Sequence, residues 1–391
     1  MRREYQVIVV GSGPAGSVAA YELAKKGIEV AILEKQHLPR YKCCAGGVSV
    51  GAAKLLDIDF QGLVEDTITR VYISFQGKTP FQGEHSGPLM YTVMRDRFDY
   101  ALVQRAKEAG AVVLEESEAT QIKINDKGVE VSTSEGDFSA QYLIGADGAN
   151  SVVARELKLQ TRREWIVAVQ REIEVEEEIL AKVKSRVILD FGRVNRGYAW
   201  IFPKLQHLSV GMACLSSEAK NLKKHYHDFL ISWNLDKGTT LREDTALLPI
   251  SRGNPIVCEG RIALVGDAAG LVDPLIGEGI YNAIWSAQLA AQTITLAIAE
   301  GNSDLLSYQQ AVNQHIVPEL EIAQKFSRLF TTFPALFFEM LKREEIVWRG
   351  CRFFLRRDMN YSSIMQGLGG LRGLMKLLLK TRDGGKIRDK D

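Results

Sequence analysis

A glycine-rich turn near the start of the chain, between an apolar strand and a helix, constrains the fold more than any other feature. Residues 5–10 are mostly apolar and β-branched, which is typical of a buried parallel strand. The turn that follows reads G-S-G-P-A-G. Gly11 permits the tight bend, Gly13 lets the backbone approach a pyrophosphate, and Gly16 lets helix and strand pack closely. The pattern predicts the phosphate-binding turn of a doubly wound α/β domain.

The elements after this turn complete a nucleotide-binding unit. A helix is predicted over residues 15–25 and a second strand over residues 29–33, with Glu34 at the strand end. A carboxylate there accepts hydrogen bonds from ribose hydroxyls, and the helix N-terminus favours a pyrophosphate. The segment from residue 5 to 35 therefore predicts a bound dinucleotide, without separating NAD from FAD.

Two later turns favour FAD. One predicted strand runs into Asp147-Gly148, and another, over residues 261–265, runs into Gly266-Asp267. Asp267 at a strand end can hold the ribityl hydroxyls of a flavin. The helix predicted after this turn can point its N-terminus at the pyrimidine edge, where the helix dipole stabilises the anionic reduced flavin.

Composition excludes several classes of protein. A length of 391 residues suggests two or three domains, and 46% apolar with 25% charged residues is typical of a soluble protein. A net charge of +1 gives no field that would attract nucleic acid. The five cysteines lack zinc-ligand spacing, so we expect no metal site and a reducing, cytoplasmic location. Residues 280–299 are uncharged but carry polar side chains, which predicts a buried helix rather than a membrane span.

The glycine turn, the Asp147-Gly148 turn and the Gly266-Asp267 turn, in this order, resemble the flavoproteins of the para-hydroxybenzoate hydroxylase type. The resemblance implies bound FAD and places Arg95 near the cofactor. No second glycine fingerprint marks a nicotinamide domain, so the electron donor stays open between NADPH and reduced ferredoxin.

Strand-like and helical patterns divide the chain further. Alternating segments at 67–82 and 184–215 predict an antiparallel sheet, and helices follow from residue 305. We expect an α/β fold, in which a Rossmann-like FAD-binding domain is interleaved with an antiparallel-sheet substrate domain and followed by a C-terminal helical region. The predicted limits are 1–66, 95–160 and 250–303 for the FAD-binding domain, 67–94 and 161–249 for the substrate domain, and 304–391 for the helical region.

Two further segments resemble the geranylgeranyl reductase family. They are R-Y-K-C-C-A-G-G at residues 40–47 and G-Y-A-W-I-F-P-K at residues 197–204. In that family a Cys-Gly-Gly-type loop lies beside the flavin, and a Tyr-x-Trp-x-Phe-Pro strand lines the substrate cavity. Ala45 departs from the glycine often found there. The resemblance implies FAD contacts at Ala15, Glu34, Cys44, Ala45, Gly47, Arg95, Ala119, Asp267, Gly279 and Ile280.

The aromatic strand has two interpretations. Tyr198, Trp200 and Phe202 are two residues apart and share one face of a strand. Such a face, followed by Pro203, suits an apolar polyprenyl chain, but it is also an ordinary core pattern. The family resemblance favours the substrate-binding interpretation for these four residues.

Cys44 also has two interpretations, a small buried hydrophobe or a residue that tunes the flavin, gates the site or donates a proton. We assign it to the site as the candidate catalytic residue, without making it the proton donor. Cys44, Tyr198 and water all stay open as proton sources, because no carboxylate–histidine pair stands out among the six histidines.

The C-terminal segment is basic. Residues 341–391 hold thirteen Lys/Arg and six Asp/Glu, a net charge of +7. Residues 349–357 and 368–380 read as basic amphipathic helices, which suit either an anionic membrane surface or a helical cap with a solvated basic face.

The sequence therefore predicts an FAD-dependent reductase that saturates C=C bonds of geranylgeranyl groups. The carrier can be a lipid, a pigment or a diphosphate, and the oligomeric state is left open. Two alternatives remain: an FAD-dependent monooxygenase of an apolar substrate, and a non-catalytic isoprenoid- or flavin-binding protein on membranes.

Overall fold

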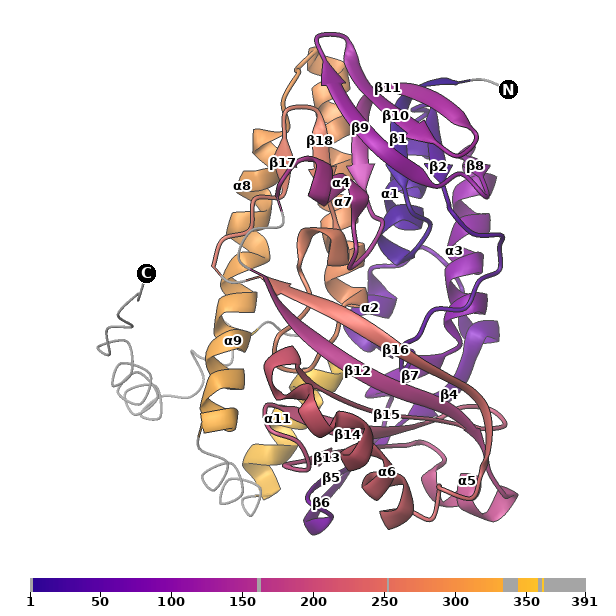
Figure 1. Ribbon diagram of the computed structural model, residues 1–391, viewed down its shortest axis with the longest axis vertical. Coiled ribbons are helices and arrows are strands. Elements are labelled where there is room, and N and C mark those ends of the chain that lie inside the picture. The colour runs from indigo at the N-terminus through magenta and orange to yellow at the C-terminus, as the bar shows by residue number, and fades with distance from the viewer. Residues whose placement is uncertain (1–2, 160–162, 252, 333–343, 358–360, 362–391) are drawn as a thin grey trace, which may run out of the picture.

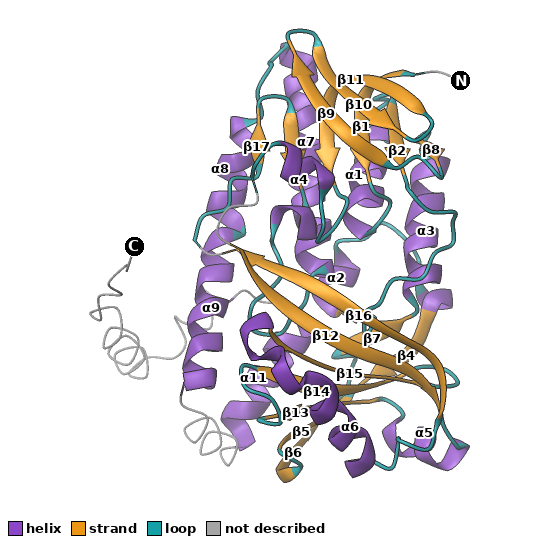
Figure 2. Cartoon of the chain, in the orientation of Figure 1, coloured by secondary structure: helices purple, strands orange, loops and turns teal. Residues whose placement is uncertain are grey.

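The structure, a computed structural model, describes residues 3–159, 163–251, 253–332, 344–357 and 361. Two large sheets lie one above the other in the view of Figure 1. Most helices surround the upper sheet, and α8 and α9 run down one side of the molecule (Figure 2).

The first sheet is built around a parallel core. Its central strand β1 (Glu4–Val10) pairs in parallel with β2 (Val30–Leu33) and β11 (Gly136–Gly145). β8 (Val112–Leu114) and β18 (Ile262–Leu264) extend it in parallel on either side. Antiparallel additions are β9 (Ala119–Asn125), β10 (Gly128–Thr133) and β17 (Cys258–Glu259). The carboxyl ends of the parallel strands meet at one edge, where α/β sheets bind their ligands.

Three helices cover this sheet. α1 (Pro14–Ala24) is almost wholly buried, because it packs against α3 (Arg95–Glu108) and α7 (Ile280–Glu300). α1 and β2 lie within one residue of their predicted limits. α7 is the uncharged segment predicted as a buried helix, and it contributes one face to the core. Within the described parts of the chain, no helix combines the length and hydropathy that a membrane span needs.

The second sheet has seven strands, and its order is β16-β12-β15-β14-β13-β5-β6. Neighbours are antiparallel except for β5 and β13, which pair in parallel. This parallel pair arises because β5 and β6 form a hairpin from an earlier part of the chain. The strands are β5 (Arg70–Phe75), β6 (Lys78–Glu84), β12 (Arg163–Glu174), β13 (Arg186–Phe191), β14 (Gly197–Pro203), β15 (Leu208–Leu215) and β16 (Thr239–Ser251).

Shorter elements join the two sheets. A three-stranded sheet of β3 (Gly47–Ser49), β7 (Met90–Val93) and β4 (Val64–Ile68) connects them. The short helices are α2 (Val50–Lys54), η1 (Gln61–Leu63), α4 (Val152–Glu156), α5 (Glu177–Val183), η2 (Ser216–Asn221), α6 (Leu222–Ser232) and η3 (Gly266–Ala269). The architecture is the predicted α/β class, whereas the exact domain limits stay a prediction.

The C-terminal region is helical, as predicted, in α8 (Leu306–His315), α9 (Val317–Thr332) and α11 (Glu344–Arg356). Trp348 and Leu355 of α11 pack onto the apolar cluster of the second sheet. The described part of the first basic segment therefore carries a buried apolar side. The second basic segment, residues 368–380, lies outside the described residues.

Candidate functional site

The glycine turn at the end of β1 has the geometry that a close-packed phosphate cradle needs. Gly11 has φ +97°, and a Cβ there would lie 2.6 Å from the Ala146 carbonyl oxygen. A Cβ on Gly16 would lie 1.9 Å from the Gly11 oxygen. Gly13 differs, since a Cβ there would meet only Arg40 Nη2, at 3.8 Å. The protein itself requires glycine at two of these positions, and the third is open toward a ligand, which fits a dinucleotide phosphate.

Glu34 lies at the end of β2, as the ribose-binding interpretation requires. Its carboxylate accepts hydrogen bonds from Ser12 N (3.1 Å), Ser12 Oγ (2.5 Å) and Gln36 N (3.0 Å). Arg40 Nε lies 3.2 Å away. Burial would raise the pKa of Glu34, but the Arg40 charge and these hydrogen bonds outweigh it and lower the pKa. Glu34 is therefore an ionised acceptor beside the glycine turn.

Arg95 is not a solvated charge at a helix start. It is 9% exposed and forms a two-pronged pair with Asp99, at 2.7 Å from Nε and 2.9 Å from Nη2. Asp99 also pairs with Arg40, at 3.2 Å. Burial would lower the pKa of Arg95, but the charges of Asp99 and then Cys44 raise it. A buried chain of charges thus runs from Glu34 at the glycine turn through Arg40 and Asp99 to Arg95.

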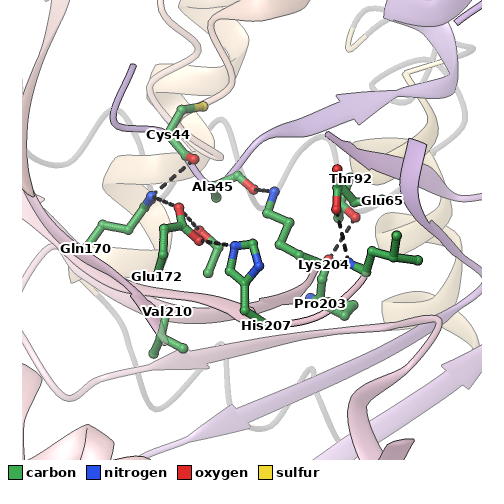
Figure 3. A network of polar contacts seen from close by, with 12 residues as sticks. Cys44, Ala45, Glu65, Thr92, Gln170, Glu172, Pro203, Lys204, His207 and Val210 are labelled. Carbon is green, nitrogen blue, oxygen red and sulfur yellow. Dashed lines mark hydrogen bonds and ion pairs between the residues drawn. The ribbon is translucent and has the colours of Figure 1, made fainter. Parts of the chain in front are cut away.

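Side chains from the second sheet hold the Cys43–Gly47 loop (Figure 3). Gln170 Nε2 on β12 donates to the Cys44 carbonyl oxygen at 3.2 Å. Lys204 Nζ, at the end of β14, donates to the carbonyl oxygens of Ala45 (2.7 Å) and Val93 (2.8 Å). Gly46 N donates to Cys44 Sγ at 3.3 Å. Burial lowers the pKa of Lys204, which is 2% exposed.

Lys204 is the last residue of the aromatic segment 197–204, but the sequence did not predict that it would hold the Cys43–Gly47 loop. The available signal was a lysine directly after an apolar strand. A flexible surface lysine gives the same signal, so only the folded contacts separate the two.

A carboxylate–histidine pair is present, contrary to the expectation from sequence. His207 Nε2 lies 3.1 Å from Glu172 Oε2. Glu172 Oε1 also accepts hydrogen bonds from Gln170 (2.9 Å), Ser209 (3.1 Å) and Tyr41 (3.2 Å). Figure 3 shows Gln170, Glu172 and His207 on the sheet side of Cys44 and Ala45. The cross-strand register that aligns Glu172 with Ser209 brings the group together, and no sequence spacing reveals it.

The aromatic strand has the predicted two faces. Trp200 and Phe202 belong to one apolar cluster, against which Ala45 of the Cys44 loop packs. Ala199 and Ile201 belong to a different cluster on the other face. A Cβ on Gly47 would lie 3.0 Å from Phe202 Cε2 and 2.4 Å from Met90 Cε. The glycine therefore lets this loop lie directly against the side chains of Tyr198, Trp200 and Phe202, which we call the aromatic wall.

The polar atoms of the aromatic strand are mostly engaged. The Tyr198 hydroxyl donates to the Ile276 carbonyl oxygen at 2.6 Å, so its proton is committed to the protein. The Pro203 carbonyl oxygen accepts from Thr92 Oγ1 at 2.8 Å. Trp200 Nε1 is buried and has no hydrogen-bond partner among the described residues.

Asp147 and Asp267 follow two neighbouring parallel strands. Asp147 accepts hydrogen bonds from Val152 N and Val153 N, at 2.6 and 3.2 Å, and so caps α4. Burial raises the pKa of Asp267, against the opposing charges of Lys42 and then Arg95. Asp147 Oδ1 also accepts a hydrogen bond from Ser151 Oγ at 2.5 Å, so both oxygens of Asp147 are engaged within the protein. Asp267 has no ion pair or side-chain hydrogen bond in the described structure, so its carboxylate stays open to polar ligand groups.

Arg163, at the start of β12, was also missed by the sequence reasoning. Its Nη2 donates to the Ala268 carbonyl oxygen at 2.6 Å, whereas its buried Nη1 has no partner among the described residues. Asp147 and Asp267 act on its pKa through their charge, but burial prevails and lowers the pKa. An unmatched buried guanidinium nitrogen beside two acid turns fits an anionic cofactor such as FAD.

The remaining predicted residues divide into two groups. Gly279 precedes Ile280, the first residue of α7, and a Cβ on Gly279 would lie 3.0 Å from Asp267 Oδ1. A Cβ on Gly266 would lie 3.3 Å from the Ala15 Cβ, so α1 and α7 meet closely at this turn. Ala119 is buried at the start of β9, in the apolar core around the first sheet.

The chain is similar to an FAD-binding domain family and to proteins named as geranylgeranyl reductases. The family described as FAD binding domain matches residues 4–188. Digeranylgeranylglycerophospholipid reductase 1 of Methanopyrus kandleri is 31% identical over 83% of this chain and 90% of its own length. The chloroplastic geranylgeranyl diphosphate reductase of Oryza sativa is 28% identical over 85% of this chain and 75% of its own length.

A solved structure shares the fold. The crystal structure of a geranylgeranyl bacteriochlorophyll reductase-like protein from Thermoplasma acidophilum has a TM-score of 0.79 and 23% identity. The match covers 95% of this chain and all of that one, so the whole architecture is common to both. Together with the sequence relatives, these matches show that the chain belongs to the geranylgeranyl reductase family of FAD-dependent oxidoreductases.

Proposed function

We propose that this protein is an FAD-dependent reductase that saturates C=C bonds of geranylgeranyl groups on a lipid, pigment or diphosphate carrier. The observation that carries the proposal is the contact between the aromatic wall of β14 and the Cys43–Gly47 loop. This contact would place an apolar chain beside the loop that is expected to lie along the flavin. The names of the relatives from Methanopyrus kandleri and Oryza sativa support the same substrate class.

Different residues of the chain would hold the cofactor and the substrate. Gly13, Glu34, Asp267 and Arg163 would hold the FAD, which when reduced supplies a hydride to the alkene. Trp200 and Phe202 would align the isoprenoid, because an isolated alkene accepts a hydride only when it is held closely. A proton must reach the second carbon, and Tyr198 is a poor source because its hydroxyl is bound to Ile276.

Cys44 remains the candidate catalytic residue. Its thiol lies beside the buried Arg95 and accepts a hydrogen bond from Gly46 N. Cys44 and water are therefore the candidate proton sources. The electron donor, NADPH or reduced ferredoxin, and contact of the basic C-terminal region with a membrane stay parts of the proposal.

Oxygen dependence separates this proposal from a monooxygenase. Purified protein is reduced anaerobically and mixed with geranylgeranyl diphosphate or a geranylgeranyl lipid. We expect flavin reoxidation without oxygen and a product with fewer double bonds. A hydroxylated product that forms only with oxygen would support the monooxygenase instead, and absence of both reactions would favour a binding protein.

A further inference from the structure

The loop from Asp273 to Gly279, which leads into α7, is folded tightly on itself. Asp273 Oδ1 accepts hydrogen bonds from Leu275 N (2.9 Å) and Ile276 N (3.2 Å). Gly277 N donates to the Asp273 carbonyl oxygen, and Asp273 N donates to that of Glu278, each at 3.0 Å. One oxygen of the Asp273 carboxylate thus shapes the loop, and the other is left for a partner outside it.

That partner comes from the C-terminal helical region. Arg357, directly after α11, is 7% exposed, and its Nη2 lies 3.3 Å from Asp273 Oδ2. Its Nε lies 3.1 Å from Glu278 Oε2. The Tyr361 hydroxyl donates to the same Asp273 oxygen at 2.8 Å. Two carboxylates at opposite ends of the loop are therefore joined by one guanidinium from far along the chain.

The surroundings of Arg357 fix it in place. The guanidinium lies over the rings of Tyr281 and Tyr361, at 4.9 and 5.3 Å from their centroids. A Cβ on Gly51 would lie 2.1 Å from the Arg357 carbonyl oxygen, so α2 packs directly on this backbone. Arg357 has φ +52°, which residues with a side chain rarely adopt. Such a conformation persists only where the contacts around it determine it.

The far side of the same loop is tied to the aromatic wall. The Tyr198 hydroxyl donates to the Ile276 carbonyl oxygen at 2.6 Å. The loop thus lies between the C-terminal segment and β14, with Gly279 and the N-terminus of α7 at its end. Any change in its shape would move both the aromatic wall and the residues expected to contact the flavin.

The charges make Arg357 hard to replace. Asp273 has, besides Arg357, two backbone N–H groups and the Tyr361 hydroxyl. Glu278 depends on Arg357 for its charged contact, and its Oε1 has no partner among the described residues. Removal of one member of a buried charge group leaves the others uncompensated. Loss of Arg357 would therefore release the Glu278 end of the loop, next to Gly279.

We propose that Arg357 is a positioning residue of the flavin site, through which the C-terminal region holds the Asp273–Gly279 loop against the aromatic wall. Arg357 acts through its ion pairs with Asp273 and Glu278. The inference rests on the proposed placement of the flavin at Gly279. It gives the C-terminal region a role inside the site, separate from any contact with membranes.

Arg357→Met tests the proposal, with Arg352→Met as the matched control. Arg352 is an exposed arginine on α11, five residues before Arg357. The dissociation constant of FAD is measured by fluorescence titration of each apoprotein. We expect R357M to weaken FAD binding by about tenfold or more, and R352M to change it by less than about twofold. Equal affinities of R357M and R352M would overturn the proposal.

Milder variants keep the test informative if R357M folds poorly. Tyr361→Phe removes one hydroxyl, and we expect it to weaken FAD binding by about twofold to fivefold. In a double-mutant cycle, Glu278→Gln should cost less in the R357M background than in the wild type. Additive effects in this cycle would contradict the coupling. FAD affinity is measured without any alkene substrate. If the wild type failed to reduce geranylgeranyl groups, the proposed function would be refuted, but the test of Arg357 would still be valid.

Discussion

Gly13→Ala separates the needs of the fold from the needs of the cofactor. Gly13 has φ −69° and ψ −178°, which alanine adopts without strain. A Cβ there would meet only Arg40 Nη2, at the ordinary contact distance of 3.8 Å. Gly13 is also the N-cap of α1, where alanine is less favourable than glycine, and this loss opposes the lower entropy of the unfolded alanine variant. We therefore expect the free energy of unfolding of the apoprotein to change by less than about 1 kcal/mol.

The same methyl group would stand where a pyrophosphate must approach the backbone. We expect G13A to weaken FAD binding by at least about tenfold, or 1.4 kcal/mol. Urea denaturation of the apoprotein gives the first quantity, and fluorescence titration with FAD gives the second. FAD would also protect G13A from unfolding less than it protects the wild type.

Gly16→Ala is the contrasting control. A Cβ there would lie 1.9 Å from the Gly11 oxygen, whereas ordinary contacts begin at 3.4 Å, so α1 and the Gly11 turn must move apart by about 1.5 Å. We expect G16A to destabilise the apoprotein itself by about 1–3 kcal/mol or more. If G13A binds FAD as tightly as the wild type, or if it unfolds as readily as G16A, the reasoning about this turn is wrong.

Three further predictions concern other parts of the site. Arg163→Met should weaken FAD binding by roughly tenfold while leaving apoprotein stability in urea equal or higher, since the guanidinium has a buried Nη1 and no ion pair among the described residues; a loss of stability with unchanged affinity would contradict this. Burial raises the pKa of Glu278, so the contribution of its protonated form to stability is lost as pH rises above the ordinary carboxyl range. The unfolding free energy of Glu278→Gln should therefore fall less with rising pH than that of the wild type. Parallel plots of unfolding free energy against pH would show that the pKa of Glu278 is not raised. Phe202→Ala and Ile201→Ala should each cost about 2–5 kcal/mol in stability, but only the first should raise KM for a geranylgeranyl substrate, because Ile201 packs on the opposite face; equal KM values would place the substrate elsewhere.

The sequence predicted those parts of the fold that depend on local pattern. The strand, glycine turn, helix and acidic strand end over residues 5–35 lie within one residue of expectation. The two faces of β14 were also predicted, because side-chain alternation along a strand is a local property. Each of these features involves residues close together in the chain.

The missed features depend on register and on distant contacts. His207 and Glu172 are 35 residues apart, and Arg357 and Glu278 are 79 apart. Their meeting depends on how β12 aligns with β15 and on where α11 ends. The parallel pairing of β5 with β13 has the same origin, since a hairpin from an earlier segment can join either edge of a sheet. No local pattern in a single sequence determines the register of distant strands or the position where a distant helix ends.

In the proposed reaction, the flavin of this protein passes its electrons to an isoprenoid double bond. An anaerobic titration tests it most directly, with fully reduced protein, limiting geranylgeranyl diphosphate, and the flavin absorbance and product mass recorded together. We expect each saturated double bond to reoxidise one flavin, with no oxygen consumed. Two results would contradict the proposed reaction. In the first, the flavin stays reduced and the geranylgeranyl substrate stays unchanged on every class of carrier. In the second, the flavin is reoxidised but the isoprenoid gains no hydrogen.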